Sequence, residues 1–194
     1  MKNTLLFTVG MLISAMLIAT VPTEAEAAIY EDTVRLHILA PSDSAEDQAL
    51  KLFIRDKLLE KYSSELSAVS CAEDAAKELL QRKCEIEEDC DRWIAESGYE
   101  YTAECRVERE WYNTREYGDI TMPAGEYSSL VITIGEGEGQ NWWCVMYPPL
   151  CLDAATATDT SYTQAENALI TRSGYRVKFK LLEVTAAISK GFSQ

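Results

Sequence analysis

The chain has 194 residues, of which 47% are hydrophobic and 26% are charged, a composition typical of globular proteins and unlike that of disordered or collagen-like chains. It carries 18 Lys and Arg against 32 Asp and Glu, which gives a formal net charge of −14. So acidic a surface repels phosphate, and this argues against a nucleic-acid partner and against electrostatic binding to anionic lipids.

The first 27 residues are typical of an export signal. Lys2 precedes an uncharged apolar segment over residues 5–21, and Pro22 ends it. Ala25 and Ala27 fit a cleavage site after residue 27. The segment is either removed as a signal peptide or retained as a membrane anchor, and in both cases we expect residues 28–194 outside the cytoplasm as a single domain. The even number of cysteines, 6, favours disulfides in that compartment, although the sequence alone does not choose their pairing.

Hydrophobic periodicity predicts a strand followed by three helices in the exported part. The strand covers residues 33–39 and carries Arg35 and His37 on one face. Ser44 begins the first helix in a capping box with Asp47, and that helix runs to about residue 62. A second capping box over residues 70–73 opens the next helix, and Gly98 caps the end of the third.

The second half of the chain is expected to supply most of the strands. Alternating side chains predict strands over residues 99–108 and 141–147, another that follows a turn at residues 123–125 and ends at Ile134, and a last one over residues 177–181. Residues 152–174 are polar and are predicted to form a surface excursion. We therefore expect an α+β fold, in which about three helices pack on one face of a mostly antiparallel sheet.

The glycine-rich segment over residues 135–139 and the single histidine both resemble parts of ligand sites. A dinucleotide loop needs a third glycine where Gln140 stands, and a strand follows here instead of a helix, so we expect a hairpin connection. His37 is accompanied by no metal-ligand spacing, and we therefore expect no metal and no cofactor.

Cys144 offers one catalytic reading and one structural reading. With His37 it could form a thiolate–imidazole pair. Cys151, however, follows across Pro148 and Pro149, and this tight return brings the two thiols within bridging reach. We expect a Cys144–Cys151 disulfide, which leaves no nucleophile.

Two further pairs have a functional and a structural reading. Asp43 and Asp47 could act as catalytic carboxylates, but negative charge at a helix N-terminus is also stabilised by the helix dipole, so no catalytic residue is assigned. Trp142 and Trp143 are adjacent in a predicted strand, and their rings point to opposite faces. An exposed ring would suit a protein partner or a sugar, and the alternative is that both rings are buried.

Two separate blocks of the sequence resemble the stage II sporulation protein R family. The first is RLHILAPSDS over residues 35–44, continued by DQALK over residues 47–51. The second comprises PAGEY over residues 123–127, GEGEG over residues 135–139, and NWWCV with PPLC up to residue 151. Residues 30 to about 184 fit the family in order and length, whereas Pro41 and Glu138 depart from its pattern.

The resemblance implies a secreted signalling protein of endospore formation that is not an enzyme. Such a protein is exported from the forespore into the intermembrane space. There it activates a membrane-embedded aspartic protease of the stage II sporulation protein GA type, which leads to processing of the sigma-E precursor. The alternative functions are a secreted hydrolase or a cell-wall-glycan-binding module.

We expect the surface that contacts the protease to combine the first strand, the loop after it and the later hairpin. Its residues are Arg35, His37, Ser42, Asp43, Ser44, Asp47, Gly137, Asn141, Trp142 and Trp143. The alternative is that Arg35 pairs with Asp43 or Asp47 and that His37 is a satisfied histidine near the core.

Overall fold

A computed structural model describes residues 2–19, 23–66, 68–117, 120–148, 163–171 and 183. The chain forms two compact units. The first comprises Met1–Ile29, Tyr112–Gly125 and Tyr162–Gln194, and the second comprises Tyr30–Trp111 and Glu126–Ser161. Among the helices in the described part of the chain, none combines the length and apolar character that crossing a membrane requires.

The first unit contains small elements. They are α1 (Lys2–Ala19), most of α2 (Glu24–Glu31), β3 (Arg115–Tyr117), β4 (Ile120–Met122) and α7 (Gln164–Ile170). β3 and β4 pair in antiparallel fashion, and α7 packs against β4. A threonine directly precedes each of α2 and α7, and its backbone N–H donates to a glutamate three residues on, which satisfies an amide at the helix start.

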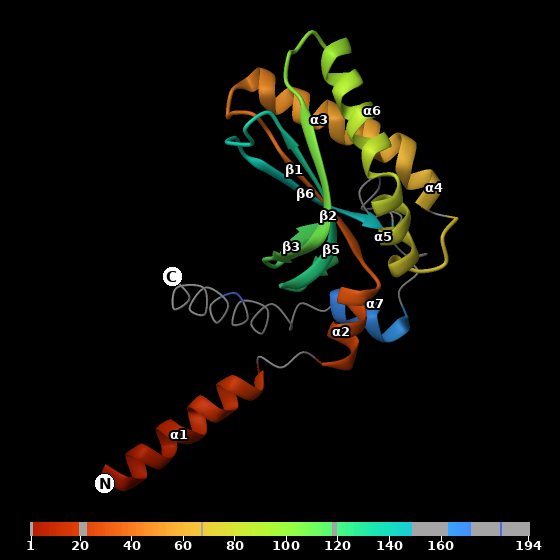
Figure 1. The fold of residues 1–194 in the computed structure, drawn as a ribbon. Helices are drawn as coiled ribbons and strands as arrows, with labels where there is room; N and C mark the ends of the chain where they lie inside the picture. Colours follow the sequence, from red (N-terminus) through yellow and green to blue (C-terminus); the bar gives the residue numbers. More distant parts are fainter. Residues whose placement is uncertain are drawn as a thin grey trace. The chain divides into compact units, whose positions relative to one another are not determined.

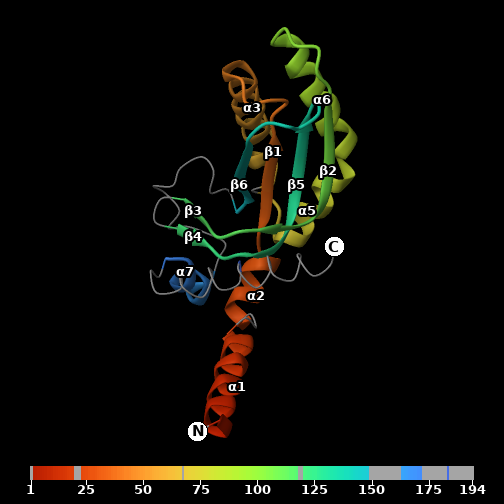
Figure 2. The ribbon, with the colours of Figure 1, turned by 90° about the vertical axis from the view of Figure 1, so that its left-hand side faces the viewer.

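The second unit is built on a mixed four-stranded sheet (Figure 1), and its strand order is β2-β5-β1-β6 (Figure 2). Its strands are β1 (Val34–Leu39), β2 (Ala103–Tyr112), β5 (Gly125–Ile134) and β6 (Asn141–Tyr147). β1 lies parallel to β5 and antiparallel to β6. The α+β class is confirmed, but the two central strands are parallel, because the helices between β1 and β5 supply a connection long enough for a parallel crossover.

Helices cover one face of this sheet (Figure 2). They are α3 (Ala45–Leu58), the π-helix η1 (Leu59–Ser63), α4 (Ser64–Leu66), α5 (Ala72–Gln81) and α6 (Lys83–Glu96). Inward side chains of β1 and β5, such as Leu36 and Ile132, are fully buried against helix residues such as Ile54 and Ile94. Each such side chain contributes about 1.5–3 kcal/mol by burial, so this layer stabilises the sheet that carries the candidate site.

The predicted helix ends are mostly confirmed. The backbone N–H of Asp47 donates to Ser44 Oγ at 3.1 Å, so the first capping serine is correct. Gly98 adopts a positive φ of 84° just beyond α6, as expected of a C-terminal glycine. The second capping box is wrong, because Cys71 precedes α5 and no side-chain hydrogen bond caps that helix.

The strand predictions differ in their limits. The strand over residues 141–147 is confirmed, whereas the one expected from residue 99 begins at Ala103. The last predicted strand, over residues 177–181, lies outside the described residues. Of the polar segment 152–174, which was predicted to form a surface excursion, the structure describes residues 163–171, and these include α7.

Candidate functional site

Two loops that carry predicted contact residues meet at one end of the sheet. Residues 40–44 connect β1 to α3, and residues 135–140 connect β5 to β6. The carboxyl ends of parallel neighbouring strands lie at the same edge, which brings the two loops together. The N–H of Gly139 donates to the carbonyl of Ala40 at 2.9 Å, and the N–H of Gln140 donates to Asp43 Oδ1 at 2.7 Å. We call these two segments the loop junction.

Lys51 of α3 ties the loop junction to the helix beneath it. Its side chain is buried, with the residue only 3% exposed, and Nζ donates to the carbonyl of Gln140 at 2.7 Å and to Gln48 Oε1 at 2.5 Å. Gln48 in turn donates through Nε2 to the carbonyl of Ser42 at 2.8 Å. Burial lowers the pKa of Lys51, an effect that Asp43 opposes and Arg55 reinforces.

The start of α3 holds the first loop in place. Ser42 Oγ donates to Asp47 Oδ2 at 2.5 Å and accepts from the N–H of Ser44 at 3.1 Å. Asp47 is therefore buried inside this cap and is not part of the exposed surface where we expected it. Asp43 and Ser44 are exposed, and Ser42 is half-buried.

Glycines allow the close approach of the two loops. A Cβ at Gly139 would lie 2.2 Å from the carbonyl oxygen of Ser42, a backbone atom that cannot move aside. Gly137, half-buried, has a φ of 66°, a conformation that favours glycine. The segment is followed directly by β6, so it is a connection between strands, as its sequence predicted.

The two tryptophans point to opposite faces, as predicted. In the register of β1 and β6, Trp142 lies opposite Ile38 and Trp143 opposite His37. Trp142 packs against the core, and the guanidinium of Arg55 lies 4.4 Å from its ring centroid. Both rings are half-buried, so each keeps an accessible part beside the exposed Asn141.

Arg35 and His37 are buried, in contrast to the surface position that we expected. Arg35 is 0% exposed, and its Nε donates to the carbonyl of Cys144 at 3.1 Å. His37 is 5% exposed, and its Nδ1 lies 2.9 and 3.0 Å from the two carboxylate oxygens of Glu110 on β2. Its ring stacks on Trp143 at 3.7 Å between centroids. This is the satisfied histidine of the alternative reading, since β2 and β6 supply its partners.

Sequence reasoning missed Lys51, Gln48, Gln140 and Glu110. A usable signal existed for Lys51, because a spacing of four residues places it on the same helix face as Asp47. Glu110 had no such signal, since its contact with His37 depends on how distant strands are arranged.

The cysteines divide into two groups. Cys144 is disulfide-bonded, and Cys151, its predicted partner, lies outside the described residues, so that pairing stays a prediction. Cys71, Cys84, Cys90 and Cys105 carry free thiols. Burial raises the pKa of the Cys105 thiol to about 12, and it also raises the pKa of the Cys90 thiol. Neither cysteine therefore provides a thiolate nucleophile near neutral pH.

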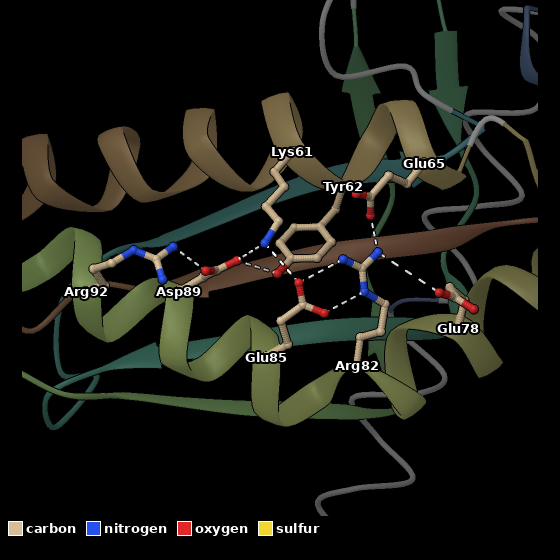
Figure 3. Close-up of polar contacts among 8 residues, drawn as sticks. All are labelled: Lys61, Tyr62, Glu65, Glu78, Arg82, Glu85, Asp89 and Arg92. Carbon is tan, nitrogen blue, oxygen red and sulfur yellow. Dashed lines mark hydrogen bonds and ion pairs between the residues drawn. The ribbon is translucent and has the colours of Figure 1, made fainter.

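A second polar cluster joins the helices on the covered face of the sheet (Figure 3). Asp89 of α6 accepts from Lys61 Nζ at 2.5 Å and from the Tyr62 hydroxyl at 2.6 Å, and it also binds Arg92. Arg82 pairs with Glu85 at 2.9 Å and with Glu65. These groups neutralise one another and link η1 and α4 to α6, which indicates a structural role.

A groove of about 430 Å³ lies between α5 and β2 in the second unit. Ala76, Leu80 and Val107 give it an apolar floor. The cations at its rim are engaged, since Lys77 pairs with Glu73 at 2.7 Å and Arg109 with Glu31 at 3.5 Å. Within the described ranges, no group of three His, Cys, Asp or Glu side chains is arranged to hold a metal ion.

Comparisons with known proteins support the family resemblance of the two sequence blocks that meet at the loop junction. The family model described as stage II sporulation protein R matches residues 30–157. The stage II sporulation protein R of Bacillus subtilis (strain 168) is 35% identical over 123 residues, which cover 63% of this chain and 55% of that relative. The chain thus spans about half the length of this curated relative, and no solved structure matches. Since the family match includes both loops and extends over most of the second unit, the chain belongs to the stage II sporulation protein R family.

Proposed function

We propose that this protein is an exported signal of endospore formation that activates a membrane-embedded aspartic protease in the mother cell. The protease, of the stage II sporulation protein GA type, would then process the sigma-E precursor. Membership of a sporulation family is the observation that carries the proposal. Residues 1–27 would direct the chain from the forespore into the intermembrane space, as a cleaved signal or as an anchor.

The loop junction is the part of the molecule best suited to contact the protease. It presents the exposed side chains of Asp43 and Ser44, and the adjoining start of β6 adds exposed Asn141 and the accessible parts of Trp142 and Trp143. Hydrogen bonds between the loops hold these groups before a partner arrives, which lowers the ordering cost of binding. A ligand activates a receptor only by binding its active state more tightly than its resting state, and a fixed surface can make that distinction.

Arg35, His37 and Asp47 have a different role in this proposal. They lie beneath the surface and support it, since Arg35 holds β6 through Cys144 and Asp47 holds the first loop through Ser42. Replacing any of these residues should lower the stability of the fold, and it should affect recognition of the protease only through that loss.

A secreted hydrolase is the second candidate, because one observation favours it. The pair formed by His37 and Glu110 has the imidazole–carboxylate geometry that orients a general base. Trp143 stacks on the imidazole, so a substrate would first have to displace that ring. This arrangement suits packing better than turnover.

Co-expression in a non-sporulating host tests the proposal. The full chain, the protease and the sigma-E precursor are expressed together and in every pair, and precursor cleavage is followed by immunoblot. We expect cleavage only when all three are present, and none when the catalytic aspartates of the protease are replaced. Cleavage that does not depend on this chain would contradict the signalling role, and cleavage by this chain without the protease would support the hydrolase.

A further inference from the structure

We propose that Lys51, a residue buried below the surface, is the positioning residue that holds the loop junction in the form that the protease recognises. The inference rests on the proposed function. With the residue 3% exposed, Lys51 has no surface to offer a partner, so any effect on activation must pass through the loops.

The geometry places the Lys51 ammonium where the two loops and α3 converge. One N–H donates to the carbonyl of Gln140 in the second loop at 2.7 Å. Another donates to Gln48 Oε1, and Gln48 Nε2 donates in turn to the carbonyl of Ser42 in the first loop. Gln140 also contacts the first loop directly, because its N–H donates to Asp43. The Lys51 side chain therefore connects both loops to α3, in addition to the hydrogen bonds that join the loops directly.

The charge of Lys51 acts in the same direction as its hydrogen bonds. Residues 40–47 and 135–141 contain no Lys or Arg, and their five carboxylates belong to Asp43, Glu46, Asp47, Glu136 and Glu138. Like charges on adjoining loops favour separation, and the Lys51 ammonium, whose charged form Asp43 favours, opposes it. An apolar side chain of similar length would remove both effects and leave the carbonyl of Gln140 without its buried donor.

A matched pair of lysines on α3 makes the test sharp. Lys51→Met removes the buried ammonium, whereas Lys57→Met removes the ammonium of a half-buried residue that pairs with Glu60 at 3.3 Å. Both variants lose one positive charge from the same helix and gain the same side chain. Gln48→Met is a third, milder variant, which keeps Lys51 but cuts the connection to Ser42.

The first measurement is amide hydrogen exchange of the full chain. We expect the amides of Gly139 and Gln140 to exchange about ten-fold faster in Lys51→Met, as the loss of one buried hydrogen bond would allow. The core amides of Leu36 and Ile38 should keep their wild-type rates, and Lys57→Met should leave both sets unchanged.

The second measurement is activation in the co-expression host with the chain under a titratable promoter, normalised to the amount of folded, exported chain. Lys51→Met should need about ten-fold more protein for half-maximal precursor cleavage and should reach the wild-type maximum. A purely structural defect would reduce the amount of folded chain and leave the half-activating amount unchanged after normalisation. If Lys51→Met does not accumulate, Gln48→Met carries the same test with a smaller shift in the same direction.

The outcomes separate this inference from the proposed function. If the wild-type chain does not activate the protease, the proposed function fails, while the exchange result still reports on the loop junction. If the wild type activates and Lys51→Met matches Lys57→Met in half-activating amount, the positioning role is overturned. Unchanged exchange at Gly139 and Gln140 in Lys51→Met overturns it as well.

Discussion

At the scale of single residues, Asp89 shows how neighbouring hydrogen bonds stabilise a buried charge. Burial opposes its ionisation, but hydrogen bonds from Lys61, Tyr62 and Arg92 outweigh burial and lower the pKa of Asp89 to about 2 (Figure 3). Because the same carboxylate has an ordinary pKa of about 3.9 in the unfolded chain, its ionisation is linked to folding.

The sign of this linkage gives a pH prediction. A depressed folded-state pKa contributes stability that is fully present above about pH 5 and is lost as the pH falls toward 2. We expect Asp89→Asn to lower the free energy of unfolding at pH 7 by about 1–3 kcal/mol and to flatten the loss of stability below pH 5. Urea unfolding at several pH values measures both effects.

Glu78 provides the control for this prediction. Glu78 Oε1 lies 4.0 Å from Arg82 Nη1, at the solvent-accessible margin of the same cluster. Glu78→Gln should change stability by less than about 0.5 kcal/mol at any pH. An Asp89→Asn variant with the wild-type dependence on pH would show that Asp89 is not the group whose titration matters.

Residue-level prediction from the sequence worked where contacts are local. Ser44 and Asp47 stand three residues apart, and the hydrogen bond between them is the one that their spacing predicts. Arg35 and His37 were correctly placed on one face of a strand, but the burial of His37 depends on Glu110 and Trp143, which are distant in the sequence. The alternation of side chains along a strand shows which residues share a face, but it does not show which distant residues cover that face.

At the scale of elements, α6 protects the edge of the sheet. β2 stands first in the strand order of the described sheet, and two of its amides are satisfied by side chains of α6. The N–H of Cys105 donates to Glu87 Oε2 at 3.0 Å, and the N–H of Ala103 donates to Asp91 Oδ1 at 2.7 Å. Unpaired edge amides recruit other strands, so these carboxylates limit aggregation as well as fix the helix on the strand.

Glu87→Ala tests this arrangement. Loss of the acceptor should speed hydrogen exchange at the Cys105 amide by about five-fold or more, since one net hydrogen bond is removed. Glu88→Ala, at the exposed neighbouring position, is the control and should leave that amide unchanged. Equal exchange rates in the two variants would mean that α6 does not protect the strand through Glu87.

The limits of the elements show what periodicity alone can supply. The strand over residues 141–147 was predicted with its observed bounds, because Pro148 stops it and its composition suits a strand. The π-helix at Leu59–Ser63 was not predicted, since its sequence continues the pattern of the preceding helix. The parallel pairing of β1 with β5 was also missed, because pairing between distant strands leaves no local pattern.

At the scale of the whole molecule, the function that we propose depends on segments that are far apart in the chain. Both loops of the junction were identified as candidates from the sequence, and the hydrogen bonds between them join the two candidates into one surface. The sequence did not reveal that Lys51 holds them together, because a lysine on a helix is normally read as solvated. The family match covers both loops, which is why we propose this surface as the one that the protease contacts.

Site-specific photo-crosslinking in the co-expression host tests that claim most directly. A photoreactive benzoylphenylalanine is placed at exposed Asn141 in one full-length variant and, as the control, at exposed Glu60 beyond the far end of α3 in another. We predict a crosslink to the protease from position 141 and none from position 60, with precursor cleavage kept in the position-60 variant. A crosslink from position 60 without one from position 141 would contradict recognition through the loop junction.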